Sequence, residues 1–407
     1  MGKKRKKPNP SMDKEKKNGP PLPPPLPLPL PATTEVEEEF RRNWPGLPEL
    51  ALHSIFSRLV SIPALLSFSS VCRSWNSLAS SSFTSNLPPL LLLPVLNLQN
   101  PNPSFSLRAH RRPTWSHPPR CRLQTLETLG RSFRPKIPSR TLALPFLGYS
   151  NGHLIFNLST PFLLLANVFS GQTTRIPFPF PFPPLYPFPR VALLTDTDLL
   201  LASDSLILSY HRATGSWSQL NHGAASLALS RDANRLFSID PDATNLRAIE
   251  FAPAGIRSRP MQVPSPPLSG PFILSSDFAH LLVDRVGELL LLRFVLQFPP
   301  PVHWRIDVFK LDPERSKWAE AESLGDWCLF VDAVGSCAAA CPEPGRWGGR
   351  SNCVYVTGPG CDGWVVVPVD GDRLFTICEP TTTTMPRWPS PVWVYPSKLK
   401  YNYQNDM

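Results

Sequence analysis

The sequence predicts a mostly β protein: a β-propeller of about five or six blades, preceded by a small three-helix unit and a disordered basic, proline-rich N-terminus. Three observations support this prediction. Fifty-two of the 407 residues are proline, which disfavours long helices, while 42% of the residues are apolar, enough for a core. From about residue 140 onward, short apolar runs alternate with turns. Only residues 44–80 place their apolar residues at helical spacing.

The pattern after residue 140 recurs as two apolar strands joined by a polar turn. We expect such turns at 170–171, 214–215, 312–316 and 370–372. A second hairpin often precedes each pair, so the repeat holds four strands and recurs about every 40 to 60 residues, which is typical of propeller blades. A two-sheet sandwich, which also gives many short strands, is the rival architecture.

These patterns divide the chain into four expected parts. They are a disordered basic and proline-rich tail (1–43), the helical unit (44–80), a proline- and arginine-rich linker (81–139) and the propeller (140–400). No run is both long and apolar enough to predict a membrane-spanning helix.

The helical unit is too small to be stable alone. Pro48 suits the first position of a helix. Ser61 can cap a second helix, and Ser69 or Ser70 a third. Three short helices cannot bury enough apolar surface, so they must fold against a partner protein or against the β domain of the same chain.

The net charge of +10 comes from two segments, 1–19 and 104–140, while the remainder is mildly acidic. This distribution weakens a nucleic-acid-binding interpretation of the whole domain. The cluster Lys3, Lys4, Arg5, Lys6 and Lys7 is interpreted as a nuclear-import signal, with a nucleic-acid contact or a solvated tail as alternatives. For the second basic segment, a solvated linker is favoured over contact with an acidic partner. Residues 20–31 favour a stiff polyproline II spacer over an SH3-type ligand.

The eight cysteines are expected to be free thiols in a reducing compartment, since no apolar signal sequence precedes them. Cys337 and Cys341, with Cys353 and Cys361, offer four thiolates for zinc, but their spacing is not compact. We therefore expect no metal site and no cofactor.

One motif resembles a hydrolase site. Residues 148–152, GYSNG, match the nucleophile-elbow pattern around Ser150, but a strand rather than a helix follows. A glycine-rich turn is the favoured interpretation, and no catalytic residue is assigned.

Residues 176–189 alternate proline with phenylalanine and cannot form a central strand. A packed connection between blades is favoured there over an exposed loop that binds a partner.

The helical unit resembles an F-box. The resemblance rests on LPELALHSIFSRL followed by IPALLSFSSVCRSWNSLA. It implies that the unit binds a Skp-type adaptor protein. The implied adaptor-binding residues are Leu47, Pro48, Leu50, Ile55, Leu59, Val71, Cys72 and Trp75.

The remainder resembles the KIB-type β-propeller domain of plant F-box proteins. The matching stretches are GYSNGHLIF, LLLANVFSGQTTRIPFP, VFKLDPERSKWAEAESLGDWCLFVD, NCVYVTG and VWVYPS. His153 stands where that family has Trp, and Val168 stands where it has Pro, which affects the expected binding face more than the fold.

Together the two resemblances imply the substrate-receptor subunit of an SCF-type ubiquitin ligase. The F-box would bind the adaptor, and through it a cullin, while the propeller would hold a protein target. Such a subunit is not an enzyme, acts in the nucleus and/or the cytoplasm, and needs neither membrane nor nucleic acid. The alternatives are a nuclear propeller that binds protein or nucleic acid outside the ubiquitin system, and a hydrolase acting through Ser150.

Overall fold

The architecture is that of a computed structural model. It describes residues 46–394 apart from 60–61, 83–87, 96–119, 127–131, 139, 145, 160, 179–190, 196, 231–234, 241, 253–254, 267–271, 285–286, 298–302, 333–337, 359–363, 372 and 376–390. None of the helices in these ranges combines the length and apolar character needed to cross a bilayer. The residues from Pro48 onward form one compact unit.

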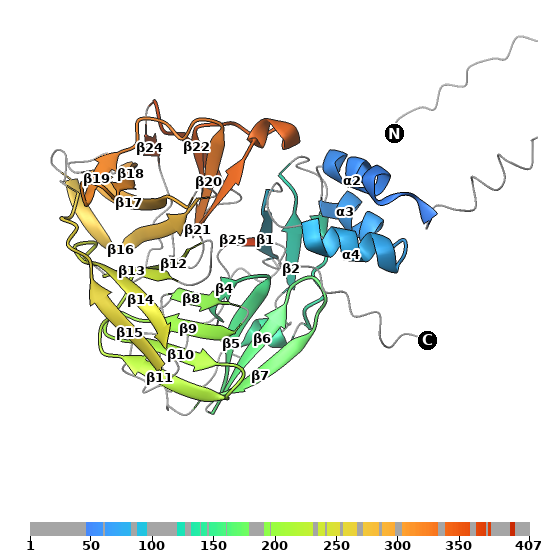
Figure 1. Cartoon of the computed structure of the whole chain (residues 1–407), viewed down its shortest axis with the longest axis horizontal. Helices are drawn as coiled ribbons and strands as arrows, with labels where there is room; N and C mark the ends of the chain where they lie inside the picture. The colour runs from blue at the N-terminus through green and yellow to red at the C-terminus, as the bar shows by residue number, and fades with distance from the viewer. Residues whose placement is uncertain are drawn as a thin grey trace, which may run out of the picture. The chain divides into compact units, whose positions relative to one another are not determined.

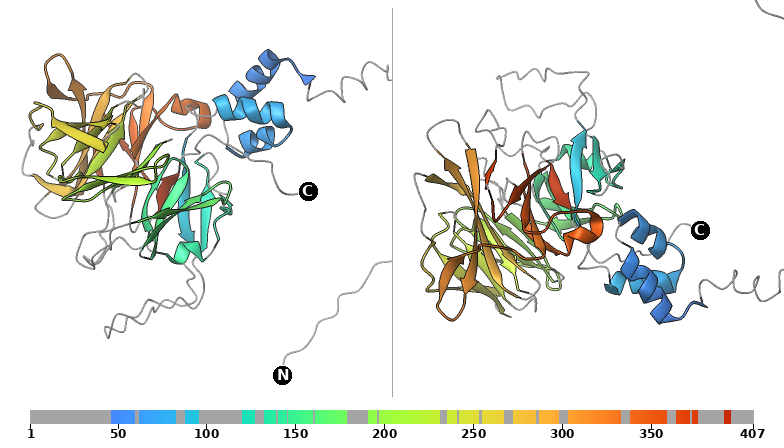
Figure 2. Two further views of the ribbon diagram at one scale, coloured as in Figure 1. Left: turned by 60° about the horizontal axis from the view of Figure 1, so that its bottom comes forward. Right: turned by 90° about the horizontal axis from the view of Figure 1, so that it is seen from above.

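Six separate sheets form the blades of a β-propeller, which confirms the predicted fold (Figure 1). Blade 1 orders its strands β25-β1-β2-β3, blade 2 β4-β5-β6-β7, and blade 3 β11-β10-β9-β8. Blade 4 orders them β12-β13-β14-β15, blade 5 β16-β17-β18-β19 with β24 added on β18, and blade 6 β21-β20-β22-β23. The two views of Figure 2 show individually twisted blades rather than the two stacked layers of a sandwich.

The strand bounds follow the blades. Blade 1 holds β1 (Leu90–Val95), β2 (Arg120–Gln124), β3 (Ser132–Phe133) and β25 (Val392–Val394); blade 2 holds β4 (Phe146–Ser150), β5 (His153–Ser159), β6 (Phe162–Asn167) and β7 (Thr173–Pro177). Blade 3 holds β8 (Val191–Leu194), β9 (Asp198–Ala202), β10 (Ile207–His211) and β11 (Ser216–Leu220); blade 4 holds β12 (Ser226–Leu229), β13 (Leu236–Ile239), β14 (Leu246–Ala252) and β15 (Gly255–Pro260). Blade 5 holds β16 (Phe272–Val283), β17 (Leu289–Gln297), β18 (His303–Asp312), β19 (Lys317–Glu320) and β24 (Leu374–Phe375); blade 6 holds β20 (Trp327–Asp332), β21 (Ala338–Pro342), β22 (Cys353–Thr357) and β23 (Val365–Pro368).

Burial falls from the inner to the outer strands of a blade. Every residue of β9 and of β22 is buried, because the faces of these strands are covered by neighbouring blades. Such strands read as continuous apolar runs rather than as alternating patterns. The outer strands β7 and β19 bury only one residue each, Ile176 and Trp318. The core therefore lies between blades, not inside a single sheet.

Side chains also tie neighbouring blades together. The Ser150 hydroxyl oxygen accepts a hydrogen bond from the backbone N–H of Leu194 at 2.9 Å, joining blades 2 and 3. Ser226 accepts one from Leu281 at 2.8 Å, joining blades 4 and 5. Because each pair is buried, these bonds satisfy polar groups that water cannot reach.

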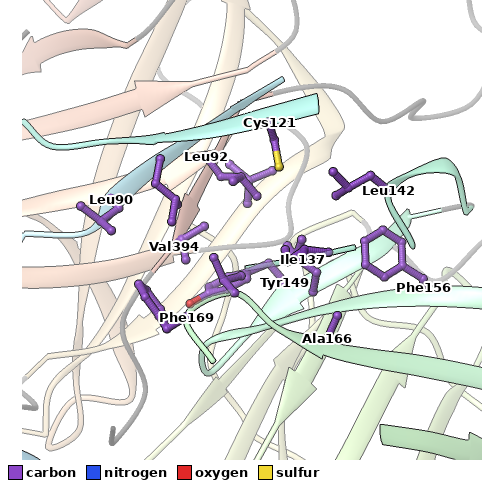
Figure 3. Close-up of a cluster of buried hydrophobic side chains, with 14 of the residues drawn as sticks. Leu90, Leu92, Cys121, Ile137, Leu142, Tyr149, Phe156, Ala166, Phe169 and Val394 are labelled. Carbon is purple, nitrogen blue, oxygen red and sulfur yellow. The ribbon is translucent and has the colours of Figure 1, made fainter. Parts of the chain in front are cut away.

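The first blade is completed by the last described strand. β25 pairs antiparallel with β1, Leu91 opposite Trp393, and the indole N–H of Trp393 donates to the carbonyl of Val331 in blade 6 at 3.0 Å. Trp393 is fully buried. Figure 3 shows side chains of β1, β2 and β25 facing those of β4 and β5 in the cluster that joins blades 1 and 2.

The range 81–139, expected as a linker, contains β1, β2 and β3. Leu90, Leu91 and Leu92 are fully buried, so this short apolar run is an inner part of blade 1. The sequence did not predict this strand because prolines surround it and Pro94 lies near its end, and proline disfavours a strand inside a sheet. The propeller therefore begins near residue 90 rather than at 140.

Three of the four expected turns join paired strands, with left-handed backbone at Gly171, Gly215 and Ser316. The turn expected at 370–372 does not: β23 pairs with β22 in blade 6, and β24 pairs with β18 in blade 5. The Arg373 side chain fixes this crossing, donating to Glu320 at 2.7 Å and to two backbone carbonyls.

The helical unit comprises α2 (Glu49–Arg58), α3 (Ile62–Ser69) and α4 (Arg73–Ser82). Its centre is aromatic: the Phe68 ring lies 5.6 Å from that of Phe56 and 4.4 Å from that of Trp75. The capping role expected for Ser69 or Ser70 was wrong. Ser69 ends α3, and α4 begins only at Arg73.

Replacing Trp393 should weaken ring closure. Trp393→Ala removes a fully buried indole and its bond to blade 6, so we expect the free energy of unfolding to fall by about 3–5 kcal/mol. Urea unfolding measures this. Phe162→Ala, which removes a side chain that is 39% exposed, is the control and should cost less than about 1 kcal/mol. Equal losses in the two variants would contradict this role of β25.

Buried His280 should make the fold acid-sensitive. Burial lowers the pKa of His280 from 6.5 to about 4, and a hydrogen bond to the backbone of Asp332 opposes this only in part. The folded state therefore keeps the ring neutral. As the pH falls from 6.5 to 4, the unfolded chain takes up the proton first, so up to about 3 kcal/mol of stability is lost.

The check is urea unfolding of wild type and His280→Asn between pH 4 and pH 7.5. The variant should show a shallower fall in stability over this range. Some slope should remain, because burial also lowers the pKa of His153 and His222. An identical slope in wild type and variant would rule out His280 as the cause.

Candidate functional site

The helical unit carries two exposed apolar side chains. Among the described residues, three large hydrophobic side chains are exposed, and two of them are Leu50 (83%) and Val71 (49%). Leu50 is the second residue of α2, and Val71 lies in the turn between α3 and α4. These two side chains are candidates for a protein-binding surface.

The sequence of α2 explains why Leu50 faces outward. Leu52 is buried, and Phe56 and Leu59 pack against the core on the same side of the helix. Leu52, Phe56 and Leu59 stand at i, i+4 and i+7, which is the spacing of a single helix face. Leu50 lies two positions before Leu52 and therefore projects from the other side of the helix. His53, which is also exposed, lies 3.7 Å from the Glu49 carboxylate and gives the surface a polar rim.

Another part of the unit packs against blade 1 and blade 2. Leu65 of α3 is 1% exposed and belongs to the same cluster as Leu90 and Leu92 of β1. Of the two possibilities left open by the sequence, packing on the chain's own β domain is therefore observed. Binding of a partner protein stays a prediction.

The expected adaptor-binding residues separate into three groups. Pro48, Leu50 and Val71 are exposed; Leu47, Ile55 and Cys72 are half-buried; Leu59 is half-buried against the propeller core, and Trp75 is buried. The F-box resemblance supplied this set, and neither the resemblance nor helical spacing indicated which of the side chains face water. Leu52, Leu65 and Phe68, which form the interior, were not in the expected site.

Ser150 has no geometry for nucleophilic catalysis. It ends β4, and a two-residue turn with left-handed Asn151 and Gly152 leads directly into β5. Its hydroxyl is buried and accepts the bond from Leu194. A nucleophile elbow instead needs an exposed hydroxyl between a strand and a helix. The motif is a hairpin turn.

Three cysteines lie side by side in blade 6. Cys328 is directly opposite Cys341 on one side and Cys353 on the other, and all three are buried, free thiols. A hydrogen bond between the protonated Cys328 thiol and Cys341, together with burial, raises the pKa of Cys328. Burial raises the pKa of Cys121 to about 12. Protonated, buried thiols are unreactive.

Within the part of the chain that the structure describes, no group of three or more His, Cys, Asp and Glu residues is arranged to hold a metal ion. Cys337 and Cys361 lie outside the described residues, as do Lys3–Lys7, the proline-rich segment 20–31 and most of the proline-phenylalanine run.

Comparison with known protein families identifies both regions. The family described as KIB1-4 beta-propeller matches residues 124–384, and the F-box-like family matches residues 44–85. Both matches agree with the resemblances found in the sequence. A search of curated proteins found no match.

Three solved structures are among those to which this chain is similar. A protein described as a 6-phosphogluconolactonase from Bacteroides uniformis is 9% identical, with 57% of this chain and 82% of that chain covered and a TM-score of 0.32. The tricorn protease is 12% identical (53% and 21% covered, TM-score 0.29). Luciferin-regenerating enzyme is also 12% identical (56% and 69% covered, TM-score 0.27).

These TM-scores are too low to support any inference about function. The family matches are different, because one of them spans more than half of the chain and includes the strands from β3 to β24. The chain therefore belongs to the KIB1-4 β-propeller family and carries an F-box-like domain before its propeller.

Proposed function

We propose that this protein is the substrate-receptor subunit of an SCF-type ubiquitin ligase. Its F-box-like unit binds a Skp-type adaptor, which in turn binds a cullin, and its propeller recruits a protein target. The observation that carries the proposal is the exposed pair Leu50 and Val71 on a helical unit whose other face is already covered.

The adaptor contact follows from the cost of leaving this pair in water. Transfer of one large aliphatic side chain from water to an apolar interface is worth about 1.5–3 kcal/mol. Leu47, Pro48, Ile55 and Cys72 are the remaining predicted members of this surface. Leu59 and Trp75 stabilise the unit from within, because one packs on the propeller core and the other on Phe68.

A receptor of this kind needs no catalytic group of its own. It raises the effective concentration of a bound target near the ubiquitin-charged enzyme, a gain that depends on geometry rather than on chemistry. The buried, hydrogen-bonded Ser150 and the buried, protonated thiols of blade 6 support this non-catalytic role.

Acidic substitution of the exposed leucine should abolish tight adaptor binding. Leu50→Asp places a charge where an apolar contact is expected, so the dissociation constant should rise roughly thirtyfold or more. Isothermal calorimetry with purified Skp-type adaptor measures the change. The melting temperature should stay constant, because the side chain is 83% exposed.

Phe162→Asp is the matched control, since it makes the same kind of change at an exposed site on blade 2. It should leave adaptor affinity unchanged. Failure of the wild-type chain to bind the adaptor would overturn the proposed function. Equal affinities of wild type and Leu50→Asp would instead remove Leu50 from the interface.

We also propose that Lys3–Lys7 direct the protein into the nucleus. Replacing these five residues by alanine should lower the nuclear-to-cytoplasmic fluorescence ratio of a tagged full-length protein several-fold, because a receptor for import signals recognises clustered positive charge. Alanine at Lys14, Lys16 and Lys17 serves as the control for total charge. An unchanged ratio in the first variant would contradict an import role.

A further inference from the structure

A single arginine of blade 6 reaches the helical unit. Arg346 lies in the short 3₁₀ helix η3 (Pro344–Trp347), in the connection from β21 to β22. Its Nη2 donates a hydrogen bond to the backbone carbonyl of Ser57 at 2.6 Å, and its Nη1 donates to the Glu343 carboxylate at 3.3 Å. The guanidinium therefore bridges an acid of its own loop and the end of α2.

The acceptor of this bond is a group that α2 itself cannot satisfy. Ser57 is in the last turn of the helix, where the final four carbonyls have no intrahelical partner. The backbone N–H of Leu59 bonds to the carbonyl of Phe56. Arg346 supplies the donor for the next carbonyl and places a positive charge at the negative end of the helix dipole. The contact thus recognises a helix end rather than a particular side chain.

η3 gives Arg346 a firm base. The neighbouring Trp347 is buried, with its ring 6.0 Å from that of Phe330 and 5.8 Å from that of Tyr355. The backbone N–H of Arg350 donates to the Tyr355 hydroxyl at 2.8 Å, which holds the far end of the same loop. Because this segment is already packed, the contact with α2 costs the entropy of ordering the Arg346 side chain but not that of ordering the loop.

A second contact acts at a different point of the helical unit. Leu65 of α3 packs with Leu90 and Leu92 of β1, and Phe56 and Leu59 of α2 pack beside it. One contact would leave the unit free to pivot, whereas an apolar contact to blade 1 and a hydrogen bond to blade 6 restrict that rotation.

We propose that Arg346 is a positioning residue that holds the F-box-like unit in one orientation on the propeller. Its consequence for target delivery rests on the proposed function, because the exposed Leu50 and Val71 would then present the adaptor at a fixed geometry to whatever the propeller holds. The contacts of Arg346 are with the Ser57 carbonyl and the Glu343 carboxylate, not with these two side chains, so Arg346 should not itself determine adaptor affinity.

The test measures orientation directly in the full chain. Spin labels on p-acetylphenylalanine introduced at the exposed positions His53 in α2 and Phe162 in blade 2 leave the native cysteines untouched. Pulsed electron paramagnetic resonance then gives the distance distribution. We expect one narrow distribution in the otherwise unchanged chain and a distribution at least twofold broader in Arg346→Ala, with an unchanged melting temperature.

Arg350→Ala is the matched control, because Arg350 is an exposed arginine of the same loop and uses its backbone rather than its side chain in the contact with Tyr355. It should keep the narrow distribution. Arg346→Lys, which retains the charge but loses the planar fork of donors, should give an intermediate width, and it carries the test if Arg346→Ala fails to fold.

An unchanged width in Arg346→Ala, or a broad distribution before any substitution at Arg346, would overturn the proposal. A lower melting temperature accompanying the broadening would also overturn it, because Arg346 would then support blade 6 rather than orient the helices. Adaptor affinity of the unsubstituted chain is measured separately. Its absence would refute the proposed function without altering the distance result.

Discussion

Closure of the ring through β25 is the constraint on which the rest of the structure depends. Each blade packs its faces on its neighbours, so a missing strand in blade 1 would expose core surface on two sides. Trp393 contributes to ring closure in two ways. Its strand completes blade 1, and its indole N–H donates a hydrogen bond to blade 6. Blade 1 also supports the helical unit through Leu90 and Leu92, and so the position of this unit depends indirectly on the same closure.

The helical unit shows how a small domain is made stable without losing a binding face. Phe56, Phe68 and Trp75 fill its centre, and Leu65 connects it to the propeller. With that stability supplied from one side, Leu50 and Val71 are free to remain in water. A unit of this size standing alone would have to bury such residues itself.

Much of the fold could be predicted from the sequence because its signals are local. A polar or glycine turn between apolar runs marks a hairpin wherever the two strands are neighbours in sequence, as at Gly171 and Gly215. Non-local pairing leaves no such signal. The partner of β1 is β25, which lies about 300 residues later in the sequence although the two strands are neighbours in the sheet. In blade 6, β20 pairs in parallel with β22, because β21 takes the inner position of the blade instead of lying between them.

The candidate site also combines features that local sequence predicts with features that depend on distant parts of the chain. The helical spacing of Val71 and Trp75 identifies them as apolar positions, and the family resemblance adds Leu50 and a role for all three. Which of them face water is decided by packing among three helices and a distant strand. Trp75 stacks on Phe68 and is enclosed, whereas Val71 sits in a turn and is not. Arg346 gave no sequence signal at all, since its partner is a backbone carbonyl far away in the chain.

The pairing of β25 with β1 also means that β1 is translated long before its partner strand. A ribosome adds about 5–20 residues per second, so roughly 300 residues between these strands take on the order of 15–60 s to emerge. Throughout that interval the Leu90–Leu92 edge of β1 has no native partner on that side. Such an edge is prone to pair with other chains. The nascent protein is therefore expected to require a chaperone until its final strand has been translated.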